Sequence, residues 1–356
     1  MLDAILNELK LDAAVITDPY NMRHVSGFRG GEGALYVSRT QKVLITDSRY
    51  TEQAARESGF TIVEEHREHK REQILAECMK KENNAGAFAM GYEDESLLCA
   101  QFDRLKDALR VEKWVPLKDK VDSLRVIKTE EELSYLAKAE EIGDRAFAKL
   151  LPLLKPGMTE LEAAAELEYL MKKEGAEDLS FNTIVASGLN SSMPHAIPSD
   201  KKMEEGDFVT FDFGCKYKGY CSDMTRTVVL GKASEKQKEI YNVVLKAQLA
   251  SLDALRAGVS GSSVDKVARD IITEAGYGEY FGHGLGHSVG LFIHENPRLS
   301  PTDDTILQPG TIETVEPGIY VPGFGGVRIE DMVVVTEDGC INFAHSPKEL
   351  IEIPVE

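Results

Sequence analysis

The sequence is short of positive charge, of paired cysteines and of long apolar runs, and each shortage excludes a class of protein. Its 41 lysines and arginines stand against 60 aspartates and glutamates, which gives a formal net charge of -19. Such an excess of negative charge repels nucleic acid and anionic membrane surfaces. We therefore expect neither of them as a partner.

The few cysteines indicate a reducing compartment. They are odd in number, widely scattered and never in CxxC spacing: Cys78, Cys99, Cys215, Cys221 and Cys340. This pattern is typical of free thiols, so we expect a cytoplasmic protein. The first ten residues, MLDAILNELK, have acidic positions and helical spacing rather than the pattern of a signal peptide. No apolar run approaches the length of a membrane span.

With 356 residues the chain exceeds the usual single core, and we predict an α/β (α+β) protein of two domains, 1–124 and 125–356. The first domain alternates short strands with helices, which is typical of a small α/β unit. Ser96 is expected to cap a helix that packs on its sheet. The strands are expected at 13–17, 34–38, 43–47 and 61–63.

The second domain is predicted to be mixed α/β with antiparallel sheet. Capping boxes beginning at Thr129 and Thr159 open helices that run to Leu150 and Gly175. Further elements are expected at 183–186, about 235–256 and 263–275.

The stretch FVTFDFGCKYKGYCSDMTRTVV, residues 208–229, reads as a β-hairpin around a Lys-Gly turn. If the hairpin is symmetric about Tyr217 and Lys218, Asp212 faces Asp223 with Cβ atoms about 5 Å apart. Two buried carboxylates at that distance need a shared proton or a cation between them. The alternative is a pair of surface aspartates beside a turn.

Glu316 and Glu330 repeat this arrangement, because they have equal parity around the turn-rich segment centred near Gly323. Together the two hairpins could bring four carboxylates onto paired strands. Such a set suits one or two divalent cations.

Histidines supply candidates for a nitrogen ligand. The segment HGLGHSVGLFIHE holds His283, His287 and His294 among glycines that permit close backbone approach. Its spacing is not the helical HExxH pattern, and each histidine alone could equally be structural. His195 lies in the polar loop SGLNSSMPHAIPSD, where it could bind a ligand or simply be solvated.

Arg328 precedes Glu330 by two residues and should point to the same side of its strand. An arginine there would orient a carboxylate ligand by hydrogen bonds.

These segments resemble the creatinase, prolidase, aminopeptidase P and methionine aminopeptidase family (M24), whose catalytic domain has the pita-bread fold. The likeness covers about residues 129–337 and rests on DFGCKYKGYCSDMTRT, HGLGHSVGLFIHE, VEPGIYVPGFGGVRIED and the SMPHA loop, in the family's order. The resemblance implies two divalent ions, with manganese first and cobalt, iron or zinc as alternatives. It implies the ligands Asp212, Asp223, His287, Glu316 and Glu330.

The resemblance also selects a branch of the family. Creatinase lacks this ligand set, and methionine aminopeptidases usually lack so long a leading domain. That domain, through VSGFRGGEGALYVS and ITDSRYTEQA, resembles the proline-directed branch and is closest to bacterial aminopeptidase P. The implied protein is a homodimeric Xaa-Pro aminopeptidase that cleaves before a proline in second position. The alternatives are a prolidase, which cuts only dipeptides, and a metal-free binding module, which typically loses ligands.

For the mechanism we expect a hydroxide that bridges the two ions as nucleophile, with Glu316 accepting and returning its proton. His195 and His294 would stabilise the oxyanion or bind the substrate. The substrate pocket would also involve His283, Tyr320 and Arg328.

Two positions depart from the family pattern. Phe292 replaces the usual acidic residue and Glu313 the usual apolar one. A strand glutamate such as Glu313 is expected on the surface or paired.

Overall fold

The structure is a computed structural model that describes residues 2–82 and 88–355. Contacts within the chain divide it into two compact units, one ending at Arg125 and the other beginning at Val126. Each unit is described by itself below.

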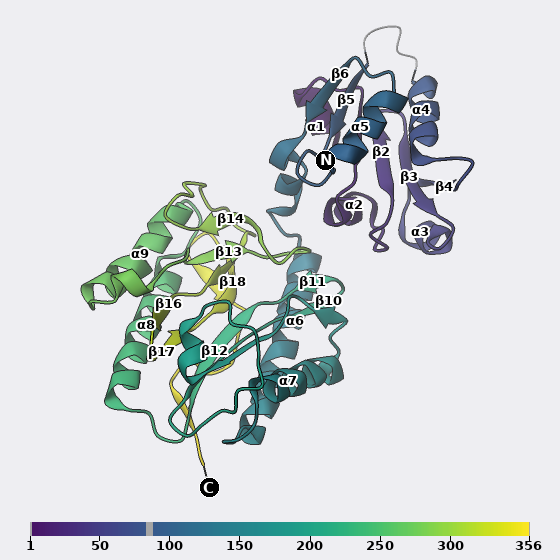
Figure 1. Cartoon of the computed structure of the whole chain (residues 1–356). Coiled ribbons are helices and arrows are strands. Elements are labelled where there is room, and N and C mark those ends of the chain that lie inside the picture. The colour runs from purple at the N-terminus through teal and green to yellow at the C-terminus, as the bar shows by residue number, and fades with distance from the viewer. Residues whose placement is uncertain (1, 83–87, 356) are drawn as a thin grey trace. The chain divides into compact units, whose positions relative to one another are not determined.

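The first unit is a mostly parallel sheet between two layers of helices (Figure 1). Its strand order is β4-β3-β2-β1-β5-β6, and β2 is the strand that runs antiparallel to its neighbours. The elements of this unit are α1 (Leu2–Glu8), β1 (Ala13–Ile16), α2 (Pro19–Ser26), β2 (Ala34–Ser38), β3 (Lys42–Asp47), α3 (Thr51–Glu57), β4 (Thr61–Glu65), α4 (Arg71–Lys81), β5 (Ala89–Tyr92), α5 (Cys99–Ala108), β6 (Lys113–Pro116), η1 (Lys118–Lys120) and η2 (Asp122–Arg125).

Both faces of this sheet are apolar because helices cover both of them. Leu6 of α1 and Ala54 of α3 pack into one hydrophobic cluster with the sheet. On the other face, Leu75 of α4 and Leu105 of α5 form a second cluster. The predicted α/β class of this unit is therefore confirmed.

The start of α5 differs from the sequence prediction. The helix begins at Cys99, and its N-cap is Leu98 rather than Ser96. The hydroxyl of Ser96 lies instead 3.2 Å from the Thr17 hydroxyl and 3.5 Å from a carboxylate oxygen of Glu93. Because those partners occupy its hydroxyl, the serine does not cap the helix.

In the second unit, helices flank a core of short, mainly antiparallel strands. Its elements are α6 (Glu130–Leu150), η3 (Leu151–Leu153), α7 (Glu160–Glu174), β7 (Asp178–Leu179), β8 (Ile184–Ser187), η4 (Gly188–Ser192), β9 (Phe208–Phe213), β10 (Cys215–Tyr217), β11 (Tyr220–Cys221), β12 (Met224–Leu230), α8 (Glu235–Ala254), α9 (Gly261–Glu274), η5 (Gly278–Tyr280), β13 (Gly286–Ser288), β14 (Glu295–Leu299), β15 (Ile312–Val315), β16 (Gly318–Val321), β17 (Gly325–Arg328), β18 (Asp331–Val335), β19 (Cys340–Asn342) and β20 (Ile351–Ile353).

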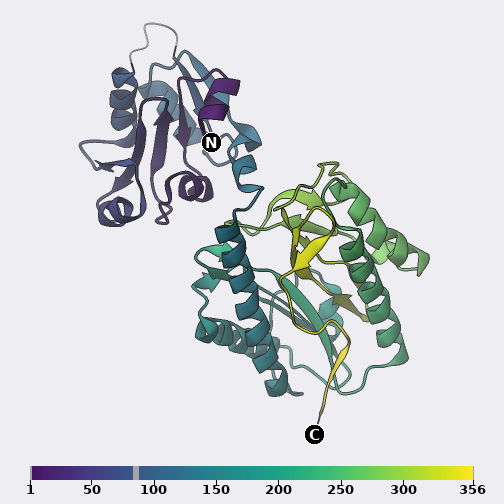
Figure 2. The ribbon, with the colours of Figure 1, turned by 180° about the vertical axis from the view of Figure 1, so that it is seen from behind.

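The helix pairs α6–α7 and α8–α9 lie on opposite sides of these strands (Figures 1 and 2). One hydrophobic cluster joins Phe147 of α6 to Phe211 of β9, and another joins Val244 of α8 to Val333 of β18. The site described below lies on the strands between these two cores.

The helix signals read from the sequence are confirmed in this unit. Thr129 and Thr159 accept hydrogen bonds from the backbone N–H three residues on, which completes the predicted capping boxes. Gly175 ends α7 with φ of 111°, a conformation that glycine adopts without strain.

The register of the central hairpin differs from the prediction by two residues. Asp212 pairs with Thr225 rather than Asp223. The turn residues are Lys218 and Gly219, with φ of 49° and 71°. A two-residue turn of this kind requires positive φ at both positions, and glycine is the favoured residue at the second. Because the shift is an even number of residues, Asp212 and Asp223 still share one face.

Across residues 2–82 and 88–355, no helix has both the length and the apolar character needed to cross a membrane.

Candidate metal and substrate site

Four acidic side chains converge from two pairs of strands. Asp212 is the last residue but one of β9, and Asp223 directly precedes β12, which pairs with β9. The β15–β18 and β16–β17 ladders share one register centred on residue 323, so Glu316 stands opposite Glu330 in the gap between them. This register agrees with the one predicted from the sequence.

His287 joins this group from the neighbouring strand β13. A Cβ on Gly286 would lie 1.9 Å from the carbonyl oxygen of Thr314, so glycine lets β13 approach β15 closely. The Nε2 atom of His287 lies 3.5 Å from both Asp223 Oδ2 and Glu316 Oε1.

The hydrogen bonding of His287 leaves its Nε2 lone pair for a ligand. Its Nδ1 lies 3.1 Å from the carbonyl oxygen of Ser288, which can only accept. Nδ1 therefore carries the proton. Burial, reinforced by His294, lowers the pKa of His287 to about 3, which keeps the imidazole neutral.

The carboxylates are held in a way that disfavours their charged forms. Burial, then the charge of Glu330, raises the pKa of Asp223 well above its ordinary value. Burial, then Glu316, does the same to the pKa of Glu330. Burial raises the pKa of Glu316 to about 7, although Arg328 opposes that shift. Such a cluster is stable in its charged form only with added positive charge.

The donor set fits divalent cations. Within the described residues, ligand atoms of Asp223, His287 and Glu330 lie within 4.8 Å of one another. In the same part of the chain, the buried Oδ1 atom of Asp212 has no hydrogen-bond partner. Several carboxylate oxygens with one imidazole nitrogen suit manganese, cobalt, iron or zinc.

Arg328 supports this cluster through different partners from the one predicted. Its Nη2 donates to Asp212 Oδ2 over 2.5 Å, and its Nε donates to the Thr225 hydroxyl over 3.0 Å. That hydroxyl in turn donates to Glu330 Oε2 over 2.7 Å. Within the described residues, the hydrogen-bonded path from Arg328 to Glu330 therefore runs through Thr225.

His283 and Tyr320 form a chain of hydrogen bonds with Arg328. His283 Nδ1 lies 2.7 Å from the Gly284 carbonyl oxygen, so this nitrogen carries the proton. Its Nε2 accepts from the Tyr320 hydroxyl over 3.0 Å, and that oxygen accepts from Arg328 Nη1 over 2.8 Å. The Tyr320 hydroxyl thus makes two hydrogen bonds within the protein. His283 and Arg328 line the cavity, whereas Tyr320 is not among the lining residues.

His195 and His294 line the open side of the same cavity. The His195 loop is anchored by the buried Glu160, which accepts from the backbone N–H groups of Ser187 and Ser199 over 2.7 and 3.1 Å. The imidazole of His294 packs edge-on against that of His287, with 4.6 Å between ring centroids. Burial lowers the pKa of His294, so it too is held neutral.

The cavity has a volume of about 510 Å³, and its wall includes a residue that the sequence analysis missed, Arg298. In the described part of the chain, no side-chain hydrogen bond or ion pair engages its guanidinium. Arg298 follows His294 by four residues, an even spacing, and it pairs with His287 across the β13–β14 ladder. That parity was the available sequence signal.

The two residues that depart from the family pattern, Phe292 and Glu313, lie in different surroundings. Phe292 is partly exposed and lies against His294, with 6.1 Å between ring centroids. Glu313, expected on the surface or paired, is fully buried, and neither carboxylate oxygen has a hydrogen-bond partner among the described residues. The expectation fails because both faces of β15 are covered.

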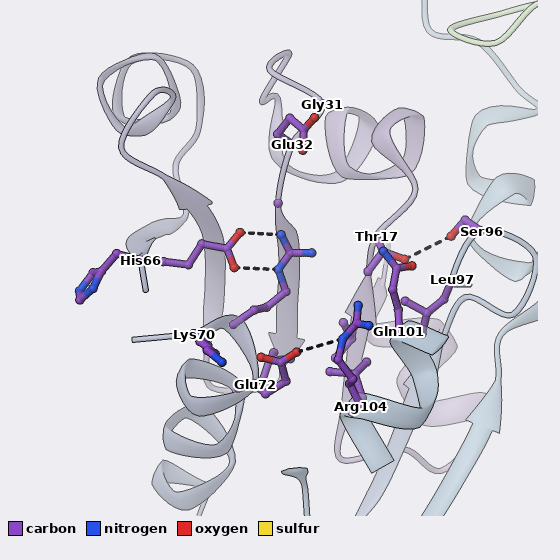
Figure 3. A pocket seen from close by; sticks show the side chains of 16 residues that line it. Thr17, Gly31, Glu32, His66, Lys70, Glu72, Ser96, Leu97, Gln101 and Arg104 are labelled. Carbon is purple, nitrogen blue, oxygen red and sulfur yellow. Dashed lines mark hydrogen bonds and ion pairs between the residues drawn. The ribbon is translucent and has the colours of Figure 1, made fainter. Parts of the chain in front are cut away.

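The first unit has a cavity of similar size, about 540 Å³, between α4 and α5 at the carboxyl ends of β1 and β4 (Figure 3). Its walls carry charges that largely pair with one another. Arg71 Nη2 lies 2.6 Å from Glu65 Oε1, and Arg104 Nε lies 3.9 Å from Glu72 Oε1. Figure 3 shows no gathering of carboxylates like that of the second unit.

In comparisons with known proteins, two family models match this chain. The model of metallopeptidase family M24 matches residues 134–337, and that of the creatinase/prolidase N-terminal domain matches residues 1–127.

Among relatives, an Xaa-Pro dipeptidase of Pyrococcus furiosus is 40% identical over 97% of each chain. A solved Xaa-Pro dipeptidase from Bacillus anthracis is 44% identical with a TM-score of 0.94, covering 100% of this chain and 98% of that one. An X-Pro aminopeptidase from Thermotoga maritima is 39% identical with a TM-score of 0.91, over 100% and 98%. The predicted arrangement, an N-terminal α/β domain before a pita-bread domain, is confirmed by these matches.

Proposed function

The chain belongs to metallopeptidase family M24, and we propose that it is an Xaa-Pro dipeptidase, or prolidase. It would hydrolyse the bond before the proline of a two-residue substrate. The sequence favoured an Xaa-Pro aminopeptidase and held the dipeptidase as the alternative. The dipeptidases among the full-length relatives support the alternative better. As a metal-dependent hydrolase, the protein is not the binding module that was also considered.

Arg298 is the observation that carries the dipeptidase assignment. A dipeptide has its free carboxylate one residue beyond the scissile bond, so the carboxylate must lie inside the cavity. Arg298 lines the cavity together with His195 and His294, and within the described residues its side chain makes no hydrogen bond or ion pair. Arginine binds carboxylates by two parallel, charge-assisted hydrogen bonds. A longer peptide would instead place an uncharged amide at this point.

We assign the metal ligands as the sequence resemblance implies. Two divalent ions would be held by Asp212, Asp223, His287, Glu316 and Glu330. When bound, such ions polarise the peptide carbonyl and activate water. Manganese stays our first choice.

The protein's own groups then have separate roles. Glu316, within 3.5 Å of His287, would accept the proton from water and return it to the proline nitrogen. His294 and His195, on the cavity wall, would donate to the carbonyl oxygen as negative charge develops there. Arg328, Tyr320 and His283 bond to one another and would act on the substrate indirectly, by fixing Asp212 and the cavity wall.

The test is a chromatographic assay of purified protein with manganese, comparing Gly-Pro, Arg-Pro-Pro and Arg-Ala-Ala. Cleavage of Gly-Pro with both tripeptides intact is the expected result. Release of arginine from Arg-Pro-Pro with Gly-Pro intact would instead establish the aminopeptidase. If the protein binds manganese and cuts none of the three, the proposal fails.

Manganese as the native metal, the homodimer and the cytoplasmic location stay predictions from the sequence. Metal analysis of protein purified without added metal and light scattering in solution would address the first two.

A further inference from the structure

Lys128 is a buried cation behind the histidines of the site. Its side chain is only 2% exposed, and its Nζ lies 3.1 Å from Glu295 Oε2. The same Nζ donates to the hydroxyl of Ser288 over 3.4 Å. The Glu295 side chain is 5% exposed, so the ion pair is shielded from water on both sides.

The two partners of Lys128 are the chain neighbours of two site histidines. Ser288 follows His287, and Glu295 follows His294. Ser288 and Glu295 also pair with each other across the β13–β14 ladder. Since successive residues of a strand point to opposite faces, Lys128 contacts the back of the segment that carries the histidines on its front.

The ladder is irregular at this point. Its register shifts between His287 and Ser288. A bulge leaves a residue without its backbone partner and bends the strand. The ammonium group binds both residues of the Ser288–Glu295 pair, which lies next to that irregularity, so it adds a side-chain link between the strands where the ladder is interrupted on one side.

Stability alone does not account for a buried lysine. Replacing a buried ion pair by apolar residues of similar volume is often neutral or stabilising, because removing two charges from water is costly. A second buried carboxyl, that of Glu313, does not account for the lysine either. The Lys128 charge lowers the pKa of Glu313, but the larger effect of burial raises it. Among the described residues no hydrogen bond joins Lys128 to Glu313.

We propose that Lys128 is a positioning residue, which fixes the separation and orientation of the His287 and His294 imidazoles by holding Ser288 and Glu295 from behind. The proposal rests on the proposed function insofar as it takes His287 as a metal ligand and His294 as a substrate-facing group. It adds a residue from the very start of the second unit to those that position the side chains of the site.

The experiment compares Lys128→Met, Lys128→Arg and the control Glu313→Leu with the unchanged protein. Manganese affinity is measured by calorimetry. Values of kcat and KM for Gly-Pro are measured at saturating manganese, at a temperature where circular dichroism shows every variant folded. The imidazole resonances of the metal-free proteins give a third readout, which needs neither metal nor substrate.

Lys128→Met should weaken manganese binding and lower kcat, each by about 10- to 100-fold, which is the usual effect of removing an outer partner of a metal ligand. KM should change much less, and the imidazole resonances should move. Lys128→Arg, which keeps the charge and the donors, should restore most of the manganese affinity and most of kcat. Glu313→Leu should match the unchanged protein in manganese affinity and in kcat.

A folded Lys128→Met variant with unchanged manganese affinity, kcat and imidazole resonances would overturn the proposal, even if its melting temperature fell. Should that variant not fold, Lys128→Met with Glu295→Gln leaves no buried charge unpaired and takes its place in the same measurements. If the unchanged protein binds manganese but does not cut Gly-Pro, the proposed function fails. The affinity and resonance measurements then still decide the role of Lys128.

Discussion

The two units contain cavities of nearly equal volume, about 540 and 510 Å³, and both are lined by charged side chains. They differ in how those charges are balanced. In the first unit, Arg71 pairs with Glu65, and Arg104 lies near Glu72. These pairs bring opposite charges together within the cavity wall itself.

In the second unit, two arginines line the cavity together with a larger group of carboxylates. Arg328 forms an ion pair with Asp212, while Glu330 and Glu316 raise the pKa of Asp223, and Glu316 raises the pKa of Glu330, in each case on top of the larger effect of burial. A cavity of this kind requires added positive charge, whereas the first cavity supplies its own. Incomplete charge balance, rather than volume, therefore distinguishes the candidate metal site from the cavity of the first unit.

The largest expected effect comes from removing a carboxylate from each cavity in turn. Asp223→Ala or Glu330→Ala should abolish manganese binding and lower turnover of Gly-Pro by more than about 100-fold, the upper effect of losing an outer-shell partner. Calorimetry and the peptide assay measure the two quantities.

The control is Glu65→Ala in the first cavity, which removes a carboxylate that is paired with an arginine. Metal binding and turnover should both remain at the level of the unchanged protein. A Glu65→Ala variant that loses metal, or an Asp223→Ala variant that keeps metal and activity, would break the distinction between the cavities.

Next in size is the effect of Arg298, whose side chain makes no hydrogen bond or ion pair within the described residues. Arg298→Ala should lower kcat/KM for Gly-Pro by about 10- to 150-fold, since a hydrogen bond to a charged group contributes about 1.5 to 3 kcal/mol. The same change at Arg104, which lies beside Glu72 in the first cavity, should have no effect.

The substrate offers a second control for Arg298. Gly-Pro amide has no terminal carboxylate, so its slower cleavage should be the same with and without Arg298. A loss that is equally large for Gly-Pro and for its amide would show that Arg298 does not bind the carboxylate.

The parts of the site that local patterns determine could be predicted from the sequence. The turn centred on Gly323 and the parity of Glu316 and Glu330 were sufficient to place these two carboxylates opposite each other. The parity of Asp212 and Asp223 was read correctly, although the turn at Lys218 and Gly219 shifted their register.

Contacts between distant segments could not be predicted in this way. Lys128 meets Glu295 across 167 residues, and no periodic pattern relates two such positions. Alternation also fails for Glu313, because it assigns one face of a strand to solvent and β15 is buried on both faces.

A separate pair of expectations concerns stability rather than binding or turnover, and it compares two buried glutamates with different partners, one from each unit. Glu93 in the first unit accepts from the backbone N–H groups of Thr17 and Asp18 over 2.5 and 2.7 Å and from the Asn21 side chain over 2.8 Å. Glu93→Leu should therefore destabilise the protein by about 1 to 3 kcal/mol for each buried donor left unpaired. Glu313→Leu removes no hydrogen bond to any described residue and should stabilise the protein by about 1 to 3 kcal/mol near neutral pH.

The pH dependence tests the second of these expectations. Burial, with a smaller contribution from Asp303, raises the pKa of Glu313 well above its ordinary value, against the opposing charges of Lys128 and Arg298. A group whose pKa is raised on folding contributes stability that is fully present below its unfolded pKa, about 4.3, and is lost as the pH rises through the folded pKa. The advantage of Glu313→Leu should therefore grow with pH. Urea unfolding of the metal-free proteins from about pH 5 to about pH 9 measures it, and because all other groups are common to both proteins, their titration cancels in the difference. Parallel stability curves for the two proteins would mean that Glu313 has a partner that satisfies its charge.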